Sequence, residues 1–477
     1  MHRLNGEDAG FLHMEMPGQP MNSMAIGVLT GEHADLTLDD VRAHVAGRLD
    51  ELPSWRWRIV KVPFDLHHPV AVRDPDFDLS RHVQEATIKG GEEELEAWFA
   101  HLAEEHLDPD LPLWQVWLVH CVDGPDGPRQ ALVAKYHHAL ADGVAAMTTF
   151  ARVYSDTDFD PLPPIPGHSG EPFTPERIPG PISLFASALW DLLVAVVLVL
   201  PGLLLRARRG IKQFRAARAL REVEVPNGTG EAPRTLLNDA FTAQRRYVRG
   251  DLPLDGMKEI KSVSGTTLND VVLAVVAGAC VRYLEPRGGL PERPLLTNVP
   301  MSAEPVGAPA RQFGNFFWVF VTSLATDVKD PWERLLQISA VSRASKRELE
   351  AIGVDLVPRW LDLVPPWLAR RGVRDTVERL RKAETDVDAS ILVSNVRGPA
   401  APWSIGGRVF TDLHVDGPPS NGVGCNVMVW SYGDRMLFGI LAYADALEAP
   451  AEFRAALEES YAELLDEAAR RSTLPAA

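Results

Sequence analysis

A proline-dense stretch, PLPPIPGHSGEPFTPERIPGP, directly follows Asp160 and separates two parts of the 477-residue chain. Proline lacks a backbone N–H and fixes φ, so a regular helix or strand cannot run through such a stretch. Helical and strand patterns alternate before it, and again after a second break, PNGTGEAP, at residues 226–233. The sequence therefore predicts two α/β domains, residues 1–160 and 234–477, joined by a linker segment, residues 161–233.

Composition narrows the class of protein. Of the residues, 46% are hydrophobic and 24% are charged, as in a folded globular protein. The formal net charge of -17 repels polyanions and argues against nucleic acid as a partner. Cys121, Cys280 and Cys425 lie far apart without C-x-x-C spacing, which argues against a disulfide framework and a zinc ribbon. The N-terminus has acids and lacks the apolar run of a signal peptide, so we expect a cytoplasmic protein.

One segment is far more apolar than the rest. From Ile178 to Leu205 the only charged residue is Asp191. The stretch that follows carries basic residues with no acid among them: Arg206, Arg208, Arg209, Lys212, Arg215, Arg218 and Arg221. This order favours a peripheral anchor on an anionic lipid surface, with a buried core helix and a membrane span as alternatives. Asp191 argues against the span, and the pair Pro201-Gly202 is expected to break the helix near its end.

The stretch AKYHHALADGVAA, residues 134–146, contains the best candidate for chemistry. If RQALVAKYHH is a strand, its side chains alternate between faces, so His137 and His138 point in opposite directions and cannot easily bind one metal ion. Asp142 is placed to cap the helix that follows. A histidine beside a helix start can act as a general base, or it can be a hydrogen-bonded structural group. The stretch FDLHHPV has adjacent histidines without a following Asp-Gly, so the pair alone is weak evidence.

Several stretches resemble one protein family, in the same order along the chain. HHALADG matches the H-H-x-x-x-D-G signature of the bacterial bifunctional wax ester synthase/acyl-CoA:diacylglycerol acyltransferase family. The other matching stretches are RLNGEDAGFLHMEMPGQPMN, LPLWQV, APRTLLNDAFTAQRRY, TLNDVVLAVVAGACVRYL, FGNFF, SNVRGP and DGPPSNGVGCNVMVWSYGDRMLFGI. The proline-rich linker and the apolar segment diverge most. H-x-x-x-D-G alone would point only to the wider group of chloramphenicol acetyltransferase-like and condensation-domain proteins.

This resemblance implies a fold and an activity. The implied fold class is α/β, with two chloramphenicol acetyltransferase-like domains that form a channel at their interface. The implied enzyme is an O-acyltransferase that moves a long-chain acyl group from acyl-CoA to diacylglycerol, to a long-chain fatty alcohol, or to both. The family uses no metal, no cofactor and no acyl-enzyme, and acyl-CoA is a substrate. His138 aligns with the catalytic histidine of the motif and is expected to take the hydroxyl proton as the acceptor attacks the thioester.

The same resemblance assigns roles to the neighbours of His138. His137 is expected to support it. Asp142 is expected to fix the loop, in such enzymes through a salt bridge to an arginine that the sequence does not identify. Gly143 would keep the turn open so that CoA can approach.

Residues outside the motif have expected roles as well. Asn269 resembles the family's functional asparagine, and its amide could donate to the oxyanion with support from Asp270, although both residues could be helix caps only. Trp114 of the P-L-W motif either lines the substrate channel or packs in the core. Ser394 and Asn395 either line the channel or shape a turn.

Three positions depart from the family pattern. Gln115 follows P-L-W where an acid is common, Asn22 replaces the usual histidine of P-M-H, and Glu304 stands where an arginine is common. None of them touches the histidine motif, so the expectation of activity stands. They put in doubt the acceptor preference and any contact of that arginine with CoA or Asp142.

The sequence leaves the binding of the CoA phosphates and the final choice of function open. The stretch Arg206 to Arg221 and the pair Arg245 and Arg246 are the candidate phosphate ligands. Two other functions stay possible in principle, a stand-alone condensation-type acyltransferase with another acceptor and a non-catalytic lipid-body-binding protein. We expect a peripheral protein at the inner face of the plasma membrane or on lipid bodies.

Overall fold

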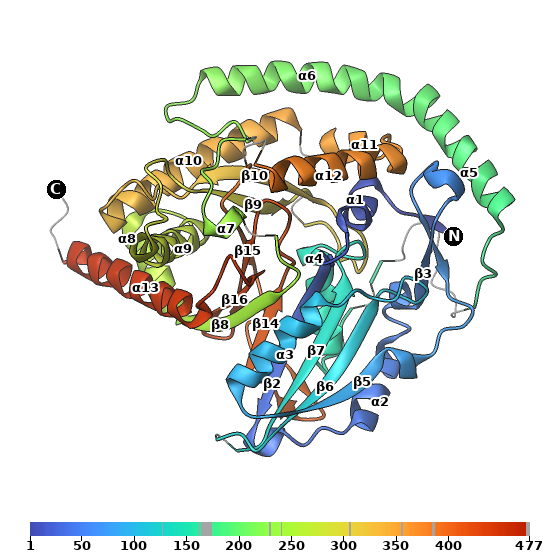
Figure 1. The fold of residues 1–477 in the computed structure, drawn as a ribbon, viewed down its shortest axis with the longest axis horizontal. Coiled ribbons are helices and arrows are strands. Elements are labelled where there is room, and N and C mark those ends of the chain that lie inside the picture. Colours follow the sequence, from blue (N-terminus) through green and yellow to red (C-terminus); the bar gives the residue numbers. More distant parts are fainter. Residues whose placement is uncertain are drawn as a thin grey trace.

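The computed structural model describes residues 1–125, 127–160, 162–163, 174–228, 230–239, 241–304, 307–353, 356–383 and 387–473. Most of the proline-rich linker predicted after Asp160 lies outside the described residues. Two mixed α/β bodies make up the molecule, each built around one large sheet (Figure 1).

The first sheet has five strands in the order β14-β2-β7-β6-β5. Their bounds are β2 (Asn22–Thr30), β5 (Val83–Lys89), β6 (Trp114–Val122), β7 (Arg129–His137) and β14 (Asp412–Asp416). Helix α3 (Glu92–Glu104) packs its apolar face on one side of this sheet, while α2 (Leu38–Arg48) and α4 (Gly143–Val153) cover the other. Alternate residues of the strands belong to the two cores, as the period of a strand requires. The predicted strand RQALVAKYHH and the predicted helix after Asp142 are confirmed as β7 and α4.

The second sheet has six strands in the order β10-β9-β11-β15-β16-β8. Their bounds are β8 (Arg245–Pro253), β9 (Leu296–Ser302), β10 (Phe317–Ser323), β11 (Ile391–Val396), β15 (Cys425–Tyr432) and β16 (Arg435–Tyr443). One core joins this sheet to α8 (Leu254–Ser264), α9 (Leu268–Leu284), α10 (Pro331–Ile352) and α13 (Pro450–Ser472). Helix α9 is apolar almost all round and is buried between the sheet and the other helices.

Strand β14 crosses from one body to the other. It lies in the second half of the sequence but pairs antiparallel with β2, with Leu413 opposite Gly27. A division of the chain at residue 234 therefore separates the sequence halves but does not separate the two sheets. Pairing between strands so far apart leaves no local pattern in the sequence, and the crossing fastens the two bodies together along the sheet edge.

The smaller elements complete the molecule. Two short sheets are present, β1-β4-β3 and β12-β13. Their strands are β1 (His2–Arg3), β3 (Trp57–Val60), β4 (Val70–Arg73), β12 (Ser404–Ile405) and β13 (Arg408–Val409). The remaining short helices are α1 (Gly6–Met14), α7 (Leu236–Asp239), α11 (Leu356–Leu361) and α12 (Pro366–Arg381). Helix α1 contacts α11 and α12, so the N-terminus of the chain packs against the second body.

The apolar segment forms one long helix across the molecule. Helix α5 (Pro181–Val194) continues through a π-helical turn, Ala195–Val199, into α6 (Leu200–Ala219). Figure 1 shows this α5–α6 helix as a green arc beyond α10, α11 and α12. The expected break at Pro201-Gly202 is wrong. The π-helical turn lies just before Pro201, and such a turn rearranges the hydrogen-bond ladder where a proline cannot donate.

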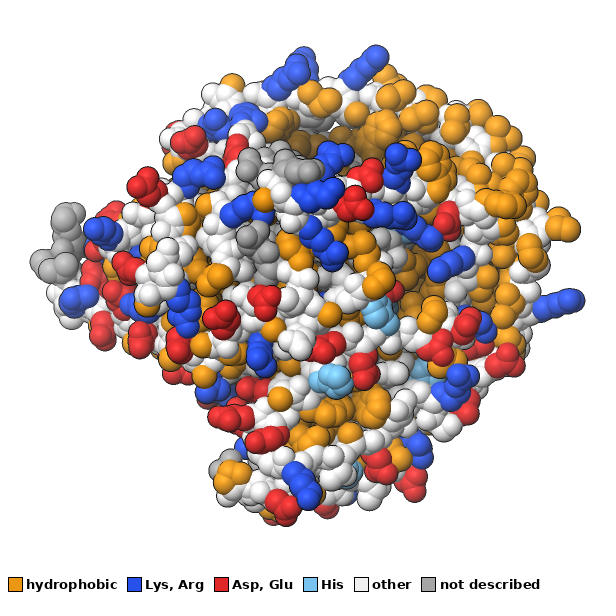
Figure 2. All heavy atoms as spheres, in the orientation of Figure 1, with side chains coloured by type: hydrophobic (Ala, Val, Ile, Leu, Met, Phe, Trp, Pro, Cys, Tyr) orange, Lys and Arg blue, Asp and Glu red, His pale blue; other side chains and the backbone are white. Residues whose placement is uncertain are grey.

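Most of the α5–α6 helix is exposed. Of its most apolar stretch, 11% is buried, which rules out the interpretation as a buried core helix. By length and composition it is long and apolar enough to cross a membrane. Figure 2 shows the hydrophobic side chains that gather along this arc. Asp191, the single acid in the apolar stretch, pairs with Arg3 Nε at 2.7 Å, so its charge is compensated from the body of the protein.

Candidate active site

The two histidines of HHALADG lie in different surroundings at the end of β7. His137 is 1% exposed. Its Nδ1 accepts a hydrogen bond from the Ala139 N–H at 3.0 Å, and its Nε2 lies 3.6 Å from a carboxylate oxygen of Glu15. His138 instead faces a cavity. The alternation of a strand end thus gives one histidine to the protein interior and the other to the cavity.

The cavity has a volume of about 450 Å³ and is lined by both bodies of the molecule. Most of its wall is apolar. The apolar lining includes Phe11, Met14, Met21, Met147, Phe150, Met301, Phe317, Val319, Leu392 and Met428. Polar side chains line it at separate places, among them Ser23, Asn298, Ser394, Asn395, Asp416 and Asn426. A mostly apolar space with polar groups at separate places suits a ligand that is mostly hydrocarbon.

The ring of His138 is held by one aromatic residue and one amide. Phe11 stacks on it, with ring centroids 4.0 Å apart and an interplanar angle of 11°. Asn315 Oδ1 lies 3.2 Å from His138 Nδ1. The Nδ2 group of Asn315 donates to Asp8 Oδ1 and to the His138 carbonyl, both at 2.9 Å. Since those two acceptors use the amide donors, Oδ1 must accept from His138, and the ring proton therefore sits on Nδ1.

This tautomer leaves Nε2 of His138 with a lone pair. Burial lowers the pKa of His138 to about 4, which keeps the ring neutral near pH 7. Burial also raises the pKa of Asp8 to about 7, although the two hydrogen bonds from Asn315 act in the opposite direction. A neutral imidazole with a fixed tautomer and a free Nε2 is the form that accepts a proton from a substrate.

Asp142 holds the loop between His138 and α4 from two sides. It is the N-cap of α4, and its Oδ1 accepts from the backbone N–H groups of Val144 at 3.0 Å and Ala145 at 3.1 Å. Its Oδ2 accepts from the Phe316 N–H at 2.8 Å and pairs with Arg311. Arg311 is thus the arginine that the sequence did not identify. The expected cap and salt bridge are both present.

Arg311 also accounts for the departure at Glu304. The carboxylate of Glu304 lies 2.5 Å from Arg311 Nε, so it shares this guanidinium with Asp142. Burial by itself lowers the pKa of Arg311, but the two carboxylates raise it further than burial lowers it. The position where the family commonly has an arginine therefore holds a carboxylate that orients the arginine seven residues later in the chain.

The segment from Arg311 to Phe317 comes from the second body and runs along the histidine loop. Gly314 N donates to Leu140 O at 2.7 Å, and Asp142 N donates to Gly314 O at 3.3 Å. Sequence reasoning missed Arg311 and Asn315 as members of this site. The motif FGNFF contained the signal for Asn315, but its contact with His138 spans 177 residues and appears only in the fold.

Asn269 and Asp270 lie at the start of α9, away from the cavity lining. Thr267 caps this helix, and Asp270 Oδ2 accepts from the Thr267 N–H and from Ser339 Oγ, both at 2.9 Å. These contacts are those of a helix cap. Asn269 is not among the residues that line the His138 cavity, and its role as an oxyanion donor stays a prediction.

The other predicted residues divide into two groups. Trp114 is buried, and its indole N–H donates to Trp55 O at 2.6 Å, so it packs in the first core and does not line the cavity. Ser394 and Asn395 do line the cavity, as does Gly143. A Cβ at Gly143 would lie 3.2 Å from Val396 Cγ2, which is close enough to narrow the cavity there.

Arg245 does not suit a role in binding phosphates. It is 3% exposed. Its guanidinium donates to the carbonyls of Thr242, Ala243 and Gly18 at 2.7 to 3.0 Å, and it lies over the ring of Tyr443. These contacts use its donors to hold the backbone. Five basic residues of α6 are exposed, and Arg218 is half-buried. Arg246 is exposed as well.

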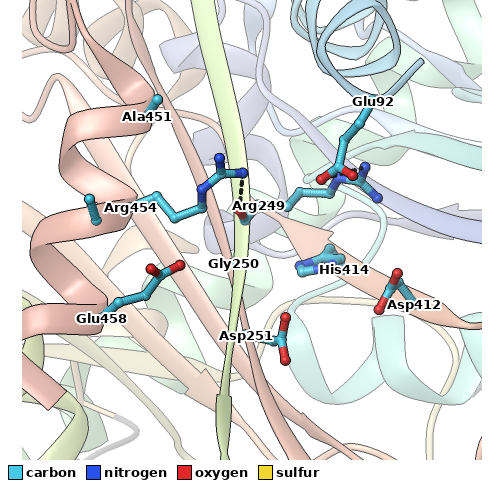
Figure 3. A pocket seen from close by; sticks show the side chains of 10 residues that line it. Glu92, Arg249, Gly250, Asp251, Asp412, His414, Ala451, Arg454 and Glu458 are labelled. Carbon is cyan, nitrogen blue, oxygen red and sulfur yellow. Dashed lines mark hydrogen bonds and ion pairs between the residues drawn. The ribbon is translucent and has the colours of Figure 1, made fainter. Parts of the chain in front are cut away.

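A second pocket, of about 320 Å³, shares no lining residue with the His138 cavity. Figure 3 shows its charged side chains, which come from α3, β8, β14 and α13. Arg249 lies 3.6 Å from Glu92 and 3.5 Å from Glu96, and its carbonyl accepts from Arg454 at 3.4 Å. Mixed charges pair here across the two bodies. Within the part of the chain that the structure describes, no group of three or more His, Cys, Asp or Glu side chains could hold a metal ion.

Comparisons with protein families and curated sequences agree with this geometry. A family model described as the wax ester synthase/diacylglycerol acyltransferase catalytic domain matches residues 4–272, and a model of the corresponding C-terminal domain matches residues 313–465. A Mycobacterium tuberculosis protein named "Putative" diacylglycerol O-acyltransferase is 31% identical over 478 residues, which cover 99% of each chain. A second protein of that organism with the same name is 30% identical and covers 97% of this chain and 96% of the relative.

Solved structures show the same fold. The wax ester synthase/diacylglycerol acyltransferase from Marinobacter aquaeolei VT8 has a TM-score of 0.65 and 26% identity, and the match covers 98% of this chain and 100% of that chain. The first condensation domain of the calcium-dependent antibiotic synthetase has a TM-score of 0.55 and 14% identity, with coverage of 98% and 96%. The predicted two-domain α/β fold class is confirmed.

Proposed function

The chain belongs to the wax ester synthase/diacylglycerol acyltransferase family, an acyltransferase family, and on that premise we propose its reaction and its catalytic base. A long-chain acyl group moves from acyl-CoA to the hydroxyl of diacylglycerol, of a long-chain fatty alcohol, or of both. His138 is the general base. The observation that carries the proposal is the neutral His138 ring, fixed by Asn315 with Nε2 unprotonated and placed in an apolar cavity.

The chemical steps follow from this arrangement. The acceptor hydroxyl gives its proton to His138 Nε2 while its oxygen attacks the thioester carbon, and a tetrahedral oxyanion forms. The oxyanion then expels the CoA sulfur, which takes the proton back from His138. An apolar wall keeps water away from the thioester, which favours transfer over hydrolysis. Acyl-CoA is a substrate in this scheme, and no step uses a metal or a cofactor.

The oxyanion needs a hydrogen-bond donor close to the thioester. Ser394 and Asn395 carry donors and line the cavity, which supports them for this role. Asn269 keeps the role that its family resemblance implies only if the start of α9 approaches the substrate. The choice among the three depends on where the thioester lies.

The α5–α6 helix brings the enzyme to its acceptor. Diacylglycerol is insoluble and lies in a bilayer or a lipid body, so the enzyme has to meet that surface. Exposed apolar side chains such as Ile182 (87%), Trp190 (65%) and Leu198 (72%) can enter the lipid, and the arginines that follow can contact anionic head groups. This arrangement suits a peripheral protein at the inner face of the plasma membrane or on lipid bodies.

One assay tests the function. Purified protein is incubated with long-chain acyl-CoA plus diacylglycerol or hexadecanol, and free thiol and ester product are measured together. We expect one thiol released for each ester formed. Thiol release only with a different acceptor would favour a condensation-type acyltransferase, and a protein that binds lipid bodies without releasing thiol would be a non-catalytic binder.

A further inference from the structure

Helix α12 carries both apolar and basic side chains on its exposed surface. Its first turn exposes Trp367 (54%) and Leu368. The turns that follow expose five basic side chains, those of Arg371, Arg374, Arg379, Arg381 and Lys382. Residues 366–382 include six basic and two acidic residues, whereas the whole chain has a formal net charge of -17. A positively charged helix with an exposed tryptophan has the composition of a helix that lies on an anionic lipid surface.

This helix lies on the same side of the molecule as the α5–α6 helix. Figure 1 shows α12 between α1 and the arc of the α5–α6 helix. Figure 2 has the same orientation and shows blue basic side chains over the position of α12, with the orange side chains of the arc beyond them. Among the described residues, most of the large hydrophobic side chains that are exposed belong to α5–α6, α11, α12 or Phe64. Exposed apolar area is thus concentrated where the basic helix lies.

The turn Pro63–Asp65 connects α12 to α5. Phe64 is 86% exposed, and the backbone is left-handed at Phe64 (φ 60°) and at Asp65 (φ 49°). A bulky residue rarely adopts this conformation, which persists where surrounding contacts hold it. One such contact is the hydrogen bond from Arg370 Nη1 of α12 to Asp65 Oδ2 at 2.8 Å. The Phe64 ring lies edge-on to Phe185 of α5, with centroids 6.2 Å apart. The turn therefore holds an exposed aromatic ring beside both helices.

Helix α12 also lies close to one wall of the His138 cavity. Helix α1 supplies Phe11 and Met14 to that wall. On the same helix, His13 Nδ1 accepts from Arg370 Nε of α12 at 3.3 Å. The surface of α12 is therefore one helix away from the cavity in which the acceptor has to react.

We propose that α12 and the turn at Phe64 lie on an anionic lipid bilayer together with the α5–α6 helix. This α12–Phe64 face consists of Phe64, Trp367, Leu368 and the five exposed basic residues of α12. The apolar side chains enter the outer part of the bilayer, and the basic groups contact the head-group phosphates. Contact along both helices turns the α1 side of the cavity toward the lipid. The inference rests on the proposed function, because a lipid-dissolved acceptor is the reason for the contact.

Labels at single positions test the contact directly. The three native cysteines are buried, so a nitroxide reagent reacts selectively with a cysteine introduced at the surface. On addition of vesicles of phosphatidylglycerol and phosphatidylcholine, labels at Phe64→Cys and Trp367→Cys should lose contact with a water-soluble nickel relaxant and gain contact with oxygen. The matched control is Lys258→Cys, which is exposed on α8, away from α12 in Figure 1, and should stay in contact with nickel.

A further label at Trp190→Cys distinguishes this face from the α5–α6 helix. If the label at Trp190 enters the lipid while those at Phe64 and Trp367 stay in contact with nickel, the α5–α6 helix is the anchor by itself and the inference is wrong. Protection of the Phe64 and Trp367 labels without vesicles, together with a dimer in light scattering, would make the face an interface between two copies. That result would also overturn the inference.

Charge reversal measures the part played by the arginines. Arg371→Glu/Arg374→Glu should weaken binding to the same vesicles about tenfold or more, since each basic residue close to an anionic surface contributes roughly a factor of five. Turnover of diacylglycerol in vesicles should fall several-fold, while turnover of a soluble alcohol should stay within about twofold. Lys258→Glu/Lys261→Glu on α8 makes the same change in net charge and should bind vesicles as wild type does. Equal binding by the two double variants would overturn the inference.

Thiol release separates this inference from the proposed function. If wild type releases thiol from acyl-CoA while the Phe64 and Trp367 labels stay in water, the inference alone is wrong. If wild type releases no thiol with either acceptor while both labels enter the lipid, the proposed function is wrong, and the lipid contact stands as that of a lipid-binding protein.

Discussion

The chain carries two pairs of adjacent histidines, and their surroundings differ. In the pair His67-His68, the backbone N–H of His68 donates to His67 Nδ1 at 2.8 Å, and His68 Nε2 contacts Leu361 O at 3.2 Å. In the pair His137-His138, only the first ring contacts the backbone through a ring nitrogen. The His138 ring contacts the Asn315 amide and faces the cavity. Both residues of the first pair are more than nine-tenths buried, and neither lines the His138 cavity.

The difference shows what makes a histidine available for chemistry. Burial lowers the pKa of both His67 and His138 to about 4, so a shifted pKa does not distinguish them. What distinguishes His138 is an amide that fixes its tautomer and a cavity in front of its other nitrogen. The region around His67 and His68 has a structural role. Arg3 donates to the His68 carbonyl at 2.8 Å and pairs with Asp191 of α5, so this region holds the exposed helix on the body.

The largest effect should come from removing His138. His138→Ala should lower kcat about 100-fold or more, because the general base is lost. His68→Ala is the matched control from the other pair and should lower the melting temperature with no comparable loss of kcat. Rates are measured by thiol release, and folding is measured by circular dichroism. A folded His138→Ala protein with full activity would end the assignment of the base.

The next largest effect should come from Asp142. Asp142→Ala removes the helix cap and leaves Arg311 without one of its carboxylates, and breaking a buried ion pair typically costs about 3–5 kcal/mol. We expect a lower melting temperature together with lower activity. Asp142→Asn keeps a cap and should lose less stability. If activity collapses while the melting curve and the acyl-CoA affinity stay unchanged, Asp142 has a chemical role instead.

A smaller effect is expected for Asn315, which acts through His138. Asn315→Ala should lower kcat about tenfold and leave the acyl-CoA KM nearly unchanged, since only the tautomer and orientation of the base are lost. Nitrogen NMR of the His138 ring supplies a readout that general destabilisation would not move. Wild type should show the proton on Nδ1, and the variant should show a mixture. An unchanged tautomer in Asn315→Ala would contradict the positioning role.

Lowering the pH from 7 to 5 should reduce the stability of the protein while its catalytic rate stays nearly constant. The folded pKa of His67 and His138 is about 4, below the unfolded value of about 6.5, so the unfolded state takes up protons first. Their contribution to stability is complete above pH 6.5 and is lost as the pH falls toward 4. Thermal melts at pH 5 and pH 7 should show this loss, and His67→Gln should reduce it.

The rate should respond differently over the same range. His138 in the folded protein stays neutral until the pH approaches 4, so log kcat/KM should be nearly flat from pH 7 to pH 5. An acid limb centred near pH 6.5 would show that the ring is more exposed in the working enzyme than in this structure.

Short-range sequence patterns predicted the features of the fold that depend on residues close together in the chain. The strand that ends at His137 and the cap at Asp142 both follow from spacing within a few residues. Arg311 and Asn315 did not follow, because their contacts with Asp142 and His138 cross 169 and 177 residues. The same reason hid the crossing of β14. A family resemblance named the right motifs, but motifs do not state which side chains meet.

The smallest effect on catalysis is expected at the exposed α5–α6 helix. Arg3, which donates to the His68 carbonyl, holds this helix on the body of the protein through Asp191. Each basic residue close to an anionic membrane contributes about 1 kcal/mol, and this contribution is screened beyond about one Debye length. Replacing Arg206, Arg208 and Arg209 with Glu should therefore weaken sedimentation with anionic liposomes. Wild type should release partly at high salt and resist full release, because its apolar side chains remain in the lipid.

The choice of acceptor makes this a test of function as well as of binding. The triple variant should lose several-fold of its turnover of diacylglycerol in liposomes, because the substrate is reached only at that surface. Turnover of a short, soluble alcohol serves as the internal control and should stay within about twofold, since the helix lies outside the His138 cavity. If the variant binds liposomes as well as wild type does and uses both acceptors equally, the exposed helix is not the membrane anchor. The apolar face of the helix would then need another partner. The region around His67 and His68 would still hold the helix on the body, but this would no longer serve membrane binding.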